Sequence, residues 1–175
     1  MSEMAGKQVN YGCLFCKAGC EQRVARDLME NKPHLEAIAP VRLRYHRGKQ
    51  MDEQDILFPG YVFIRTDMDC KLPLEIEHRY VYRVLCNAER DWRLYGADAL
   101  IAEEMFRAGG VIGYSRVYYE NRRIRIREGF LKDYEGSITR VNRRMRTAEV
   151  ALTFCKREMR IWVGFEEIAG VDSGT

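Results

Sequence analysis

The chain has 175 residues, of which 46% are hydrophobic and 31% are charged, and its formal net charge at pH 7 is +3. A chain of this length can hold one or two domains with a sizeable core, so any boundary has to be found in the residue pattern. No stretch approaches the roughly 20 consecutive apolar residues that cross a membrane, and residues 1–8 carry no signal pattern. We therefore expect a cytoplasmic protein with no membrane partner.

The six cysteines favour reduced thiols over disulfides or a metal site. Disulfides are uncommon in chains that are not exported. Cys13, Cys16 and Cys20 are clustered, but no fourth ligand stands at a familiar zinc spacing. In addition, Cys13 and Cys16 fall on opposite faces of the strand predicted there. We expect no metal and no other cofactor.

The N-terminal part of the chain alternates predicted strands with predicted helices. Residues 11–16 are almost all apolar, as in a strand covered on both faces, and residues 21–31 carry apolar side chains at helical spacing before Pro33. The polar run 46–55 is predicted to be a mobile connection. In chain order we expect a strand at 11–16, a helix at 21–31, strands at 37–45 and 57–66, a short helix at 72–78, a strand at 81–85 and a helix at 97–108.

From residue 124 onward the pattern changes to short alternating strands separated by turns. Ile124 and Ile126 alternate with arginines, and apolar residues from Ala148 to Phe154 alternate with polar ones, so one face is core and the other is wet. About 50 residues cannot build two sheets, and closing the strands into a barrel hides their edges. The predicted fold class is α+β, with an antiparallel sheet flanked by helices in residues 1–117, a linker at 118–123 and a small five-stranded β-barrel in 124–175.

The excess positive charge lies in the C-terminal part. Residues 1–117 hold 17 basic and 17 acidic side chains, and residues 122–146 hold nine basic side chains, eight of them Arg, against three acidic ones. Such a cluster indicates a nucleic-acid partner or a solvated basic face, and the planar guanidinium suits RNA because it contacts phosphate and stacks on bases. We expect RNA contacts from Arg123, Arg125, Arg127, Arg140, Arg143, Arg144, Arg146, Lys156 and Arg157.

Trp162, close to Arg160, adds a stacking platform for a base if it faces outward, whereas a core position is the alternative. Catalysis has little support in the sequence. The three histidines have no metal spacing, and neither a phosphate-binding glycine loop nor a nucleophile signature is present. We predict a protein that is not an enzyme.

Four segments of the chain resemble the NusG family of transcription elongation factors. Residues 19–28 are similar to the first helix of its N-terminal (NGN) module, and Leu57-Phe58-Pro59-Gly60-Tyr61-Val62 is similar to its polymerase-docking strand. Residues 81–85 continue the agreement, and residues 128–138 resemble the KOW motif of its C-terminal barrel. All four follow the order and spacing of the family.

The resemblance implies that the clamp helices of RNA polymerase lie in a depression lined by aromatic and apolar side chains. Core packing is the alternative for each of these residues, because both faces of the strand at 57–66 carry large apolar groups. The candidate polymerase contacts are Tyr11, Phe58, Pro59, Tyr61 and Val81.

The chain also departs from the family pattern. The paired aromatics of the first strand become Tyr11-Gly12, and the Gly-Arg after the late Phe becomes Cys155-Lys156. The Arg-rich barrel resembles specialised paralogues such as RfaH and LoaP, and the absence of a competing helical period is more similar to LoaP. This implies a monomeric antitermination factor that binds nascent RNA, a hairpin being the candidate form, with non-template DNA as a further candidate partner. Two alternatives stay open: a barrel that recruits a ribosomal protein or Rho at Leu131, and a ribosome-associated KOW protein.

Overall fold

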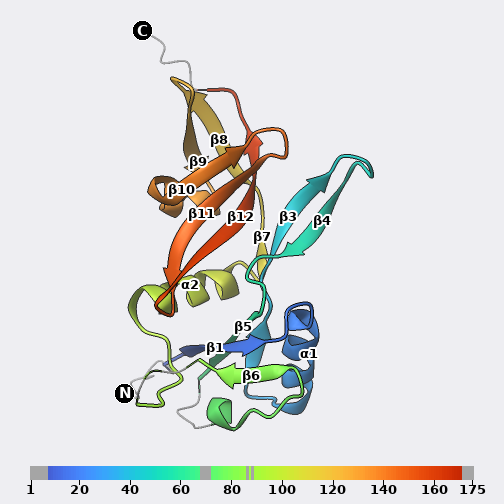
Figure 1. Cartoon of the computed structure of the whole chain (residues 1–175), viewed down its shortest axis with the longest axis vertical. Coiled ribbons are helices and arrows are strands. Elements are labelled where there is room, and N and C mark those ends of the chain that lie inside the picture. Colours follow the sequence, from blue (N-terminus) through green and yellow to red (C-terminus); the bar gives the residue numbers. More distant parts are fainter. Residues whose placement is uncertain (1–7, 68–71, 86, 88, 171–175) are drawn as a thin grey trace, which may run out of the picture. The chain divides into compact units, whose positions relative to one another are not determined.

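A computed structural model describes residues 8–67, 72–85, 87 and 89–170 (Figure 1). Two compact units interleave in the sequence: unit 1 comprises residues 1–40 and 58–110, and unit 2 comprises residues 41–57 and 111–175. Within the described ranges, no helix has both the length and the apolar character that crossing a membrane requires. Cys70 and Cys86 lie outside the described residues.

Unit 1 is built on an antiparallel sheet with the strand order β2-β5-β1-β6. Helix α1 packs against β2 and β5, and helix α2 packs against β1 (Figure 1). Its elements are β1 (Asn10–Cys16), α1 (Glu21–Asn31), β2 (Glu36–Ile38), β5 (Tyr61–Thr66), the 3₁₀ turn η1 (Leu72–Glu75), β6 (Val81–Val84) and α2 (Gly96–Arg107).

The core of unit 1 follows the apolar runs of the sequence. Leu14 and Val62 face each other across β1 and β5 and are fully buried, as is Val24 on α1. The charged side of α1 stays exposed, because its apolar side chains recur at helical spacing and cover one face only. The predicted strand at 11–16, helix at 21–31, strand at 81–85 and helix at 97–108 are confirmed within a residue at each end.

Unit 2 contains a five-stranded sheet with the order β10-β11-β12-β8-β9. The β12–β8 pair is parallel and the other pairs are antiparallel. The 3₁₀ segment η2 contacts β8, β9 and β11, which gives the strands a barrel-like arrangement. The elements are β8 (Ser115–Glu120), β9 (Arg123–Glu128), η2 (Phe130–Ser137), β10 (Ile138–Asn142), β11 (Thr147–Phe154) and β12 (Arg157–Glu167). The α+β fold class is confirmed.

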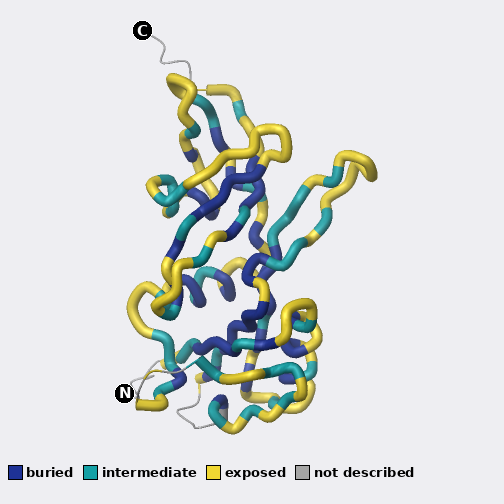
Figure 2. Tube along the Cα trace, in the orientation of Figure 1, coloured by how far each residue is buried: buried dark blue, intermediate teal, exposed yellow. Residues whose placement is uncertain are grey.

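A β-hairpin from the first half of the sequence also belongs to unit 2. It consists of β3 (Val41–His46) and β4 (Met51–Ile56), and β3 pairs in parallel with β7 (Val111–Ile112). The hairpin contacts β12 at Gly164, where an added Cβ would lie 2.7 Å from the carbonyl oxygen of Leu43. Figure 2 shows its exposed tip. The mobile connection predicted at 46–55 is therefore wrong, since β4 pairs with β3 along its whole length.

The strand predicted at 37–45 is two strands that enter different sheets. β2 pairs with β5 and β3 pairs with β4, and the chain changes direction at Ala39-Pro40. Proline cannot donate to a strand ladder and restricts the residue before it, so the break falls there. The strand predicted at 57–66 likewise begins only at Tyr61, after the turn at 57–60.

The linker predicted at 118–123 is instead the end of β8 and its turn into β9. Tyr118 pairs with Arg125 in an antiparallel hairpin. The two turn residues, Asn121 and Arg122, have φ angles of 49° and 64°, as in a type I′ turn. The boundary between the units lies between residues 110 and 111, because β7 and β8 both belong to unit 2.

Candidate functional site

The candidate polymerase contacts divide between core and surface. Phe58 has no exposed surface and packs edge-on against Phe63, with ring centroids 5.3 Å apart, so it belongs to the core of unit 1 and lines no depression. Tyr11 is half-buried beneath Phe106 of α2, at a ring distance of 5.8 Å. Pro59 is exposed, and of the five candidates it is the most accessible.

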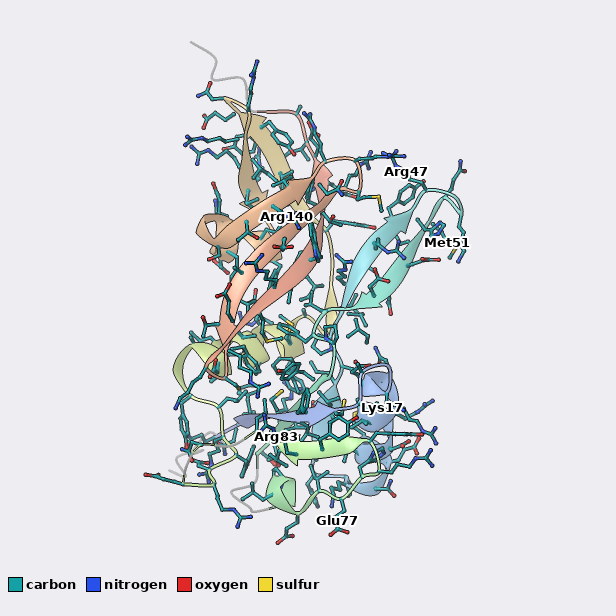
Figure 3. All side chains as sticks on the ribbon, viewed as in Figure 1. Lys17, Arg47, Met51, Glu77, Arg83 and Arg140 are labelled. Carbon is teal, nitrogen blue, oxygen red and sulfur yellow. The ribbon has the colours of Figure 1, made fainter. Side chains whose placement is uncertain are left out.

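An aromatic patch forms beside this turn from Phe15, Tyr61 and Tyr82. The ring of Phe15 lies 5.6 Å from that of Tyr61 and 5.5 Å from that of Tyr82. Tyr82 is 63% exposed, whereas Tyr61 is almost buried. The guanidinium of Arg83, which Figure 3 labels on β6, lies 5.8 Å from the centre of the Phe15 ring. The patch therefore offers an exposed aromatic surface with one basic group at its edge.

The turn at Pro59-Gly60 is held in place by the buried carboxylate of Glu21. Oε1 of Glu21 accepts a hydrogen bond from the Gly60 N–H at 2.8 Å, and Oε2 accepts one from the Gly19 N–H at 2.8 Å. The Gly60 carbonyl accepts from the Cys16 N–H at 2.8 Å. Gly60 has a φ of +85°, and a Cβ there would lie 3.2 Å from the Phe15 ring. The turn thus fixes the edge of the aromatic patch.

Gly12 has a packing role that explains one departure from the family pattern. A Cβ on Gly12 would lie 2.8 Å from the Trp92 ring, which covers β1 there. Trp92 is 3% exposed. The indole thus occupies the space into which a second aromatic side chain on β1 would project.

Three of the nine candidate RNA contacts are engaged in salt bridges. Arg143 holds Glu167 with two contacts of 2.6 and 3.1 Å, and its guanidinium lies 4.3 Å from the Tyr119 ring centre. Arg125 lies between Glu120 and Glu135, at 3.1 and 3.3 Å. Arg140, labelled in Figure 3, lies 4.0 Å from Glu149.

The other six candidates are exposed and form no salt bridge with any residue that the structure describes. They lie in three places: two flank Arg125 on the edge strand β9, two lie in the β10–β11 turn, and two lie at the β11–β12 turn. They are Arg123, Arg127, Arg144, Arg146, Lys156 and Arg157. Their positive charge is therefore not neutralised by neighbouring carboxylates of the described chain.

Comparison with known proteins identifies the N-terminal segment. Residues 10–91 match the family described as "Transcription termination factor nusG". This segment is similar to that family. A solved structure titled "Domain interaction in Thermotoga maritima NusG" aligns with 90% of this chain and 94% of its own, with 16% sequence identity and a TM-score of 0.46. A comparison with curated proteins gave no match.

The match covers 82 of the 175 residues. The matched segment includes the aromatic patch, the Glu21–Gly60 contact and the β3–β4 hairpin, although that hairpin packs in unit 2.

Sequence reasoning missed Phe15 and Tyr82 as surface residues of unit 1. A register shift between Phe15 and Cys16, where β1 meets β6, alters which β6 residue lies beside each β1 residue. A bulge of this kind is a property of the strand pairing and leaves no mark in either strand alone. The partial exposure of Phe15 was not predicted for a second reason: residues 11–16 are almost all apolar, which indicated a strand covered on both faces.

Recruitment of a protein partner at Leu131 requires an exposed apolar side chain, but Leu131 is buried. Its side chain has no exposed surface, and its N–H donates to Oγ of Ser115 at 3.0 Å. Leu131 therefore stabilises the barrel core and offers no apolar anchor to a partner.

Proposed function

We propose that this protein is a NusG-family processive antitermination factor of the LoaP type, which docks on RNA polymerase through unit 1 and binds nascent RNA through the barrel of unit 2. The observation that carries the proposal is the set of six exposed cationic side chains in the barrel that form no salt bridge with the described residues. Unpaired cations on strands and turns are available to phosphates, because no intramolecular carboxylate has to be displaced first.

The aromatic patch is the proposed dock for the polymerase clamp helices. Exposed Tyr82 beside half-buried Phe15 supplies a large contact area with few rotatable bonds, which suits a binding hot spot. Pro59 and Val81 adjoin the patch through the neighbouring turn and strand, and Arg83 adds a positive charge. This revises the docking surface away from Phe58 and towards β1 and β6.

Arginine makes RNA the favoured ligand of the barrel. The fork of a guanidinium contacts two phosphate oxygens at once, which lysine cannot do. An RNA hairpin has phosphates along a rigid stem and unpaired bases in its loop. It can therefore contact cations on more than one strand or turn of the barrel. Non-template DNA offers the same phosphates and is the alternative nucleic-acid ligand for these cations.

The test is single-round transcription across a terminator that lies downstream of a leader RNA. Wild-type protein should increase read-through, and the Arg144→Gln/Arg146→Gln variant should lose most of the increase. Arg116→Gln is the matched control, because Arg116 is an exposed barrel arginine already bound to Glu128 at 3.2 Å. Unchanged read-through with wild-type protein would refute antitermination.

A salt series separates RNA binding from protein recruitment by the barrel. The logarithm of the affinity for single-stranded RNA should fall against the logarithm of salt concentration with a slope of about −0.7 per phosphate contacted. Replacing both turn arginines should therefore make the slope less steep by about 1.4. A salt-insensitive complex, or capture of ribosomes without polymerase in a pull-down, would favour a protein-recruiting or ribosome-associated barrel instead.

A further inference from the structure

The outer face of the strands β10, β11 and β12 carries a tryptophan. On β12, Ile161 and Val163 are buried in the barrel at 2% and 0% exposure, and the half-buried Trp162 between them points to the opposite face. The condition for a stacking platform, that Trp162 faces outward, is therefore met. Figure 2 shows mostly exposed residues at the start of this strand and mostly buried ones in its second half.

The cross-strand neighbours of Trp162 are arranged around one carboxylate. Glu149 on β11 pairs with Trp162 on one side and with Arg140 of β10 on the other. The Glu149 side chain is only 6% exposed, and its Oε1 accepts a hydrogen bond from Oγ1 of Thr139 at 2.9 Å. This row places Trp162, Glu149 and Arg140 on one face of three adjacent strands.

Two arginines share the carboxylate: Arg140, which is in the row, and Arg160, which lies two residues before Trp162 on the same strand. Arg160 lies 3.5 Å from Oε1 of Glu149, and Arg140 lies 4.0 Å from Oε2. The side chains of these arginines are 60% and 70% exposed, so both retain donors that point to solvent. Arg160 also lies 3.8 Å from the exposed carboxylate of Glu158, so two guanidinium groups and two carboxylates lie on this face, and only Glu149 is buried. A buried acceptor that orients two exposed cations next to an aromatic ring is suited to an anionic, flat ligand.

We propose that Trp162, Arg140 and Arg160 form a stacking site for one unpaired RNA base, with the arginines contacting its flanking phosphates. This inference rests on the RNA-binding function proposed above and adds which face of the barrel takes a base. A stacked base needs an accessible π-face with cations close by. Trp162 is half-buried on the outer face, and Ala151, which faces Arg160 across the strands, is a small neighbour on the same face. Glu149 stays buried below the plane of contact and so repels the phosphates less than an exposed carboxylate.

Intrinsic fluorescence gives a direct readout, since the chain has two tryptophans and Trp92 is 3% exposed. The Trp92→Phe variant leaves Trp162 as the sole indole. It is titrated with dodecamers of uridylate and adenylate and with an RNA hairpin that has an unpaired loop. The anisotropy of end-labelled RNA is recorded in parallel, so that binding is measured independently of stacking. We expect quenching of Trp162 emission that saturates at the same RNA concentration as the anisotropy.

The outcomes separate the inference from the function on which it rests. Binding by anisotropy without quenching overturns the stacking site and leaves RNA binding intact. No anisotropy change with any of the three RNAs overturns both. If the Trp92→Phe variant does not fold, the same comparison is made in the natural chain, as the difference in quenching between the wild type and Trp162→Phe.

Affinity measurements on Trp162 variants complete the test. Trp162→Leu should weaken binding about 5-fold to 150-fold, while Trp162→Phe, which keeps an aromatic face, should retain most of the affinity. The slope of affinity against salt should be unchanged in Trp162→Leu, because no phosphate contact is lost. Tyr95→Leu, which removes a 60% exposed aromatic residue from unit 1, is the control and should not alter RNA affinity. Equal losses in the Leu and Phe variants would contradict stacking.

Discussion

Glu21 and Gly60, which are 39 residues apart in the sequence, are joined by a buried hydrogen bond of 2.8 Å from the Gly60 N–H to the Glu21 carboxylate. The same carboxylate accepts from the Gly19 N–H, and Glu21 is only 2% exposed. Both donors are backbone groups close to the start of α1, where a negative charge is also stabilised by the helix dipole. One side chain therefore ties the β1–α1 connection to the turn that supports the aromatic patch.

Removing this carboxylate should destabilise unit 1. Glu21→Ala leaves two N–H groups without their acceptor, and we expect a loss of about 2–4 kcal/mol in the free energy of unfolding, measured by urea denaturation. Glu30→Ala on the exposed side of the same helix is the control and should stay within about 0.5 kcal/mol of wild type. Equal effects of the two changes would show that the buried bonds contribute no more than helix propensity.

Adding a methyl group at Gly12 should disturb the contact with Trp92. The new Cβ would lie 2.8 Å from the ring and 3.1 Å from the Trp92 carbonyl oxygen, so we expect Gly12→Ala to cost about 1–3 kcal/mol of unfolding free energy. Gly113→Ala provides a control in open space, because no atom lies within 4 Å of its added Cβ. A neutral Gly12→Ala, assessed by thermal unfolding, would mean that Trp92 moves aside without cost.

Polymerase binding should depend on Tyr82 more than on Phe58. Tyr82 is 63% exposed, so Tyr82→Glu should weaken binding to RNA polymerase while the protein remains folded. Phe58→Ala empties a fully buried site and should lower stability by about 3–5 kcal/mol. Co-sedimentation with polymerase and circular dichroism distinguish the two effects. Full polymerase binding by Tyr82→Glu would rule out the aromatic patch as the dock.

The thiol of Cys16 should react slowly with alkylating reagents at neutral pH. Burial raises its pKa to about 11, with the Glu21 carboxylate adding to the shift. The thiolate is the reactive form, so its fraction at pH 8 is on the order of one in a thousand. Alkylation by iodoacetamide, followed by mass spectrometry, should accelerate about tenfold per pH unit up to the pKa. The half-buried Cys20 serves as the internal comparison and should be modified first.

A glycine at the second position of the β8–β9 turn should stabilise the protein. Arg122 has a φ of 64°, in the left-handed region where a side chain is unfavourable and where Asn-Gly is the preferred pair. Arg122→Gly should raise the free energy of unfolding by up to about 1 kcal/mol. Arg123→Gly, one residue later in β9, should lower it by about 0.5–1 kcal/mol. A loss of stability at both positions would contradict the turn type.

Several features of the chain were readable from local sequence because they depend on neighbouring residues alone. The helix at 21–31 coincides with α1 because its apolar side chains repeat every three to four residues and the turn before it breaks the strand. The alternation along β11 likewise identified Ala148, Val150, Leu152 and Phe154 as the inner face of a strand, and all four are buried. The concentration of arginines in 122–146 needed nothing beyond a count.

The features that sequence could not determine all depend on contacts between distant segments. Phe15 is half-buried next to β6, where the register between β1 and β6 shifts, whereas Phe58 lies in the turn before β5 and is buried against Phe63. Neither contact leaves a local trace in the sequence. The polar residues 46–55 carry few apolar side chains of their own. They are ordered because β4 pairs with β3, which also pairs with β7.

The barrel divides in the same way. Sequence by itself determined that residues 122–146 are basic and rich in arginine. Which of these cations are neutralised depends on the fold, because Glu120, Glu135 and Glu167 form salt bridges with Arg125 and Arg143 from other elements. The outward position of Trp162 also depends on the tertiary structure. The sequence of β12 does not say which set of alternating side chains faces the core. In the structure Ile161 and Val163 are buried on the inner face, so Trp162 lies on the outer face.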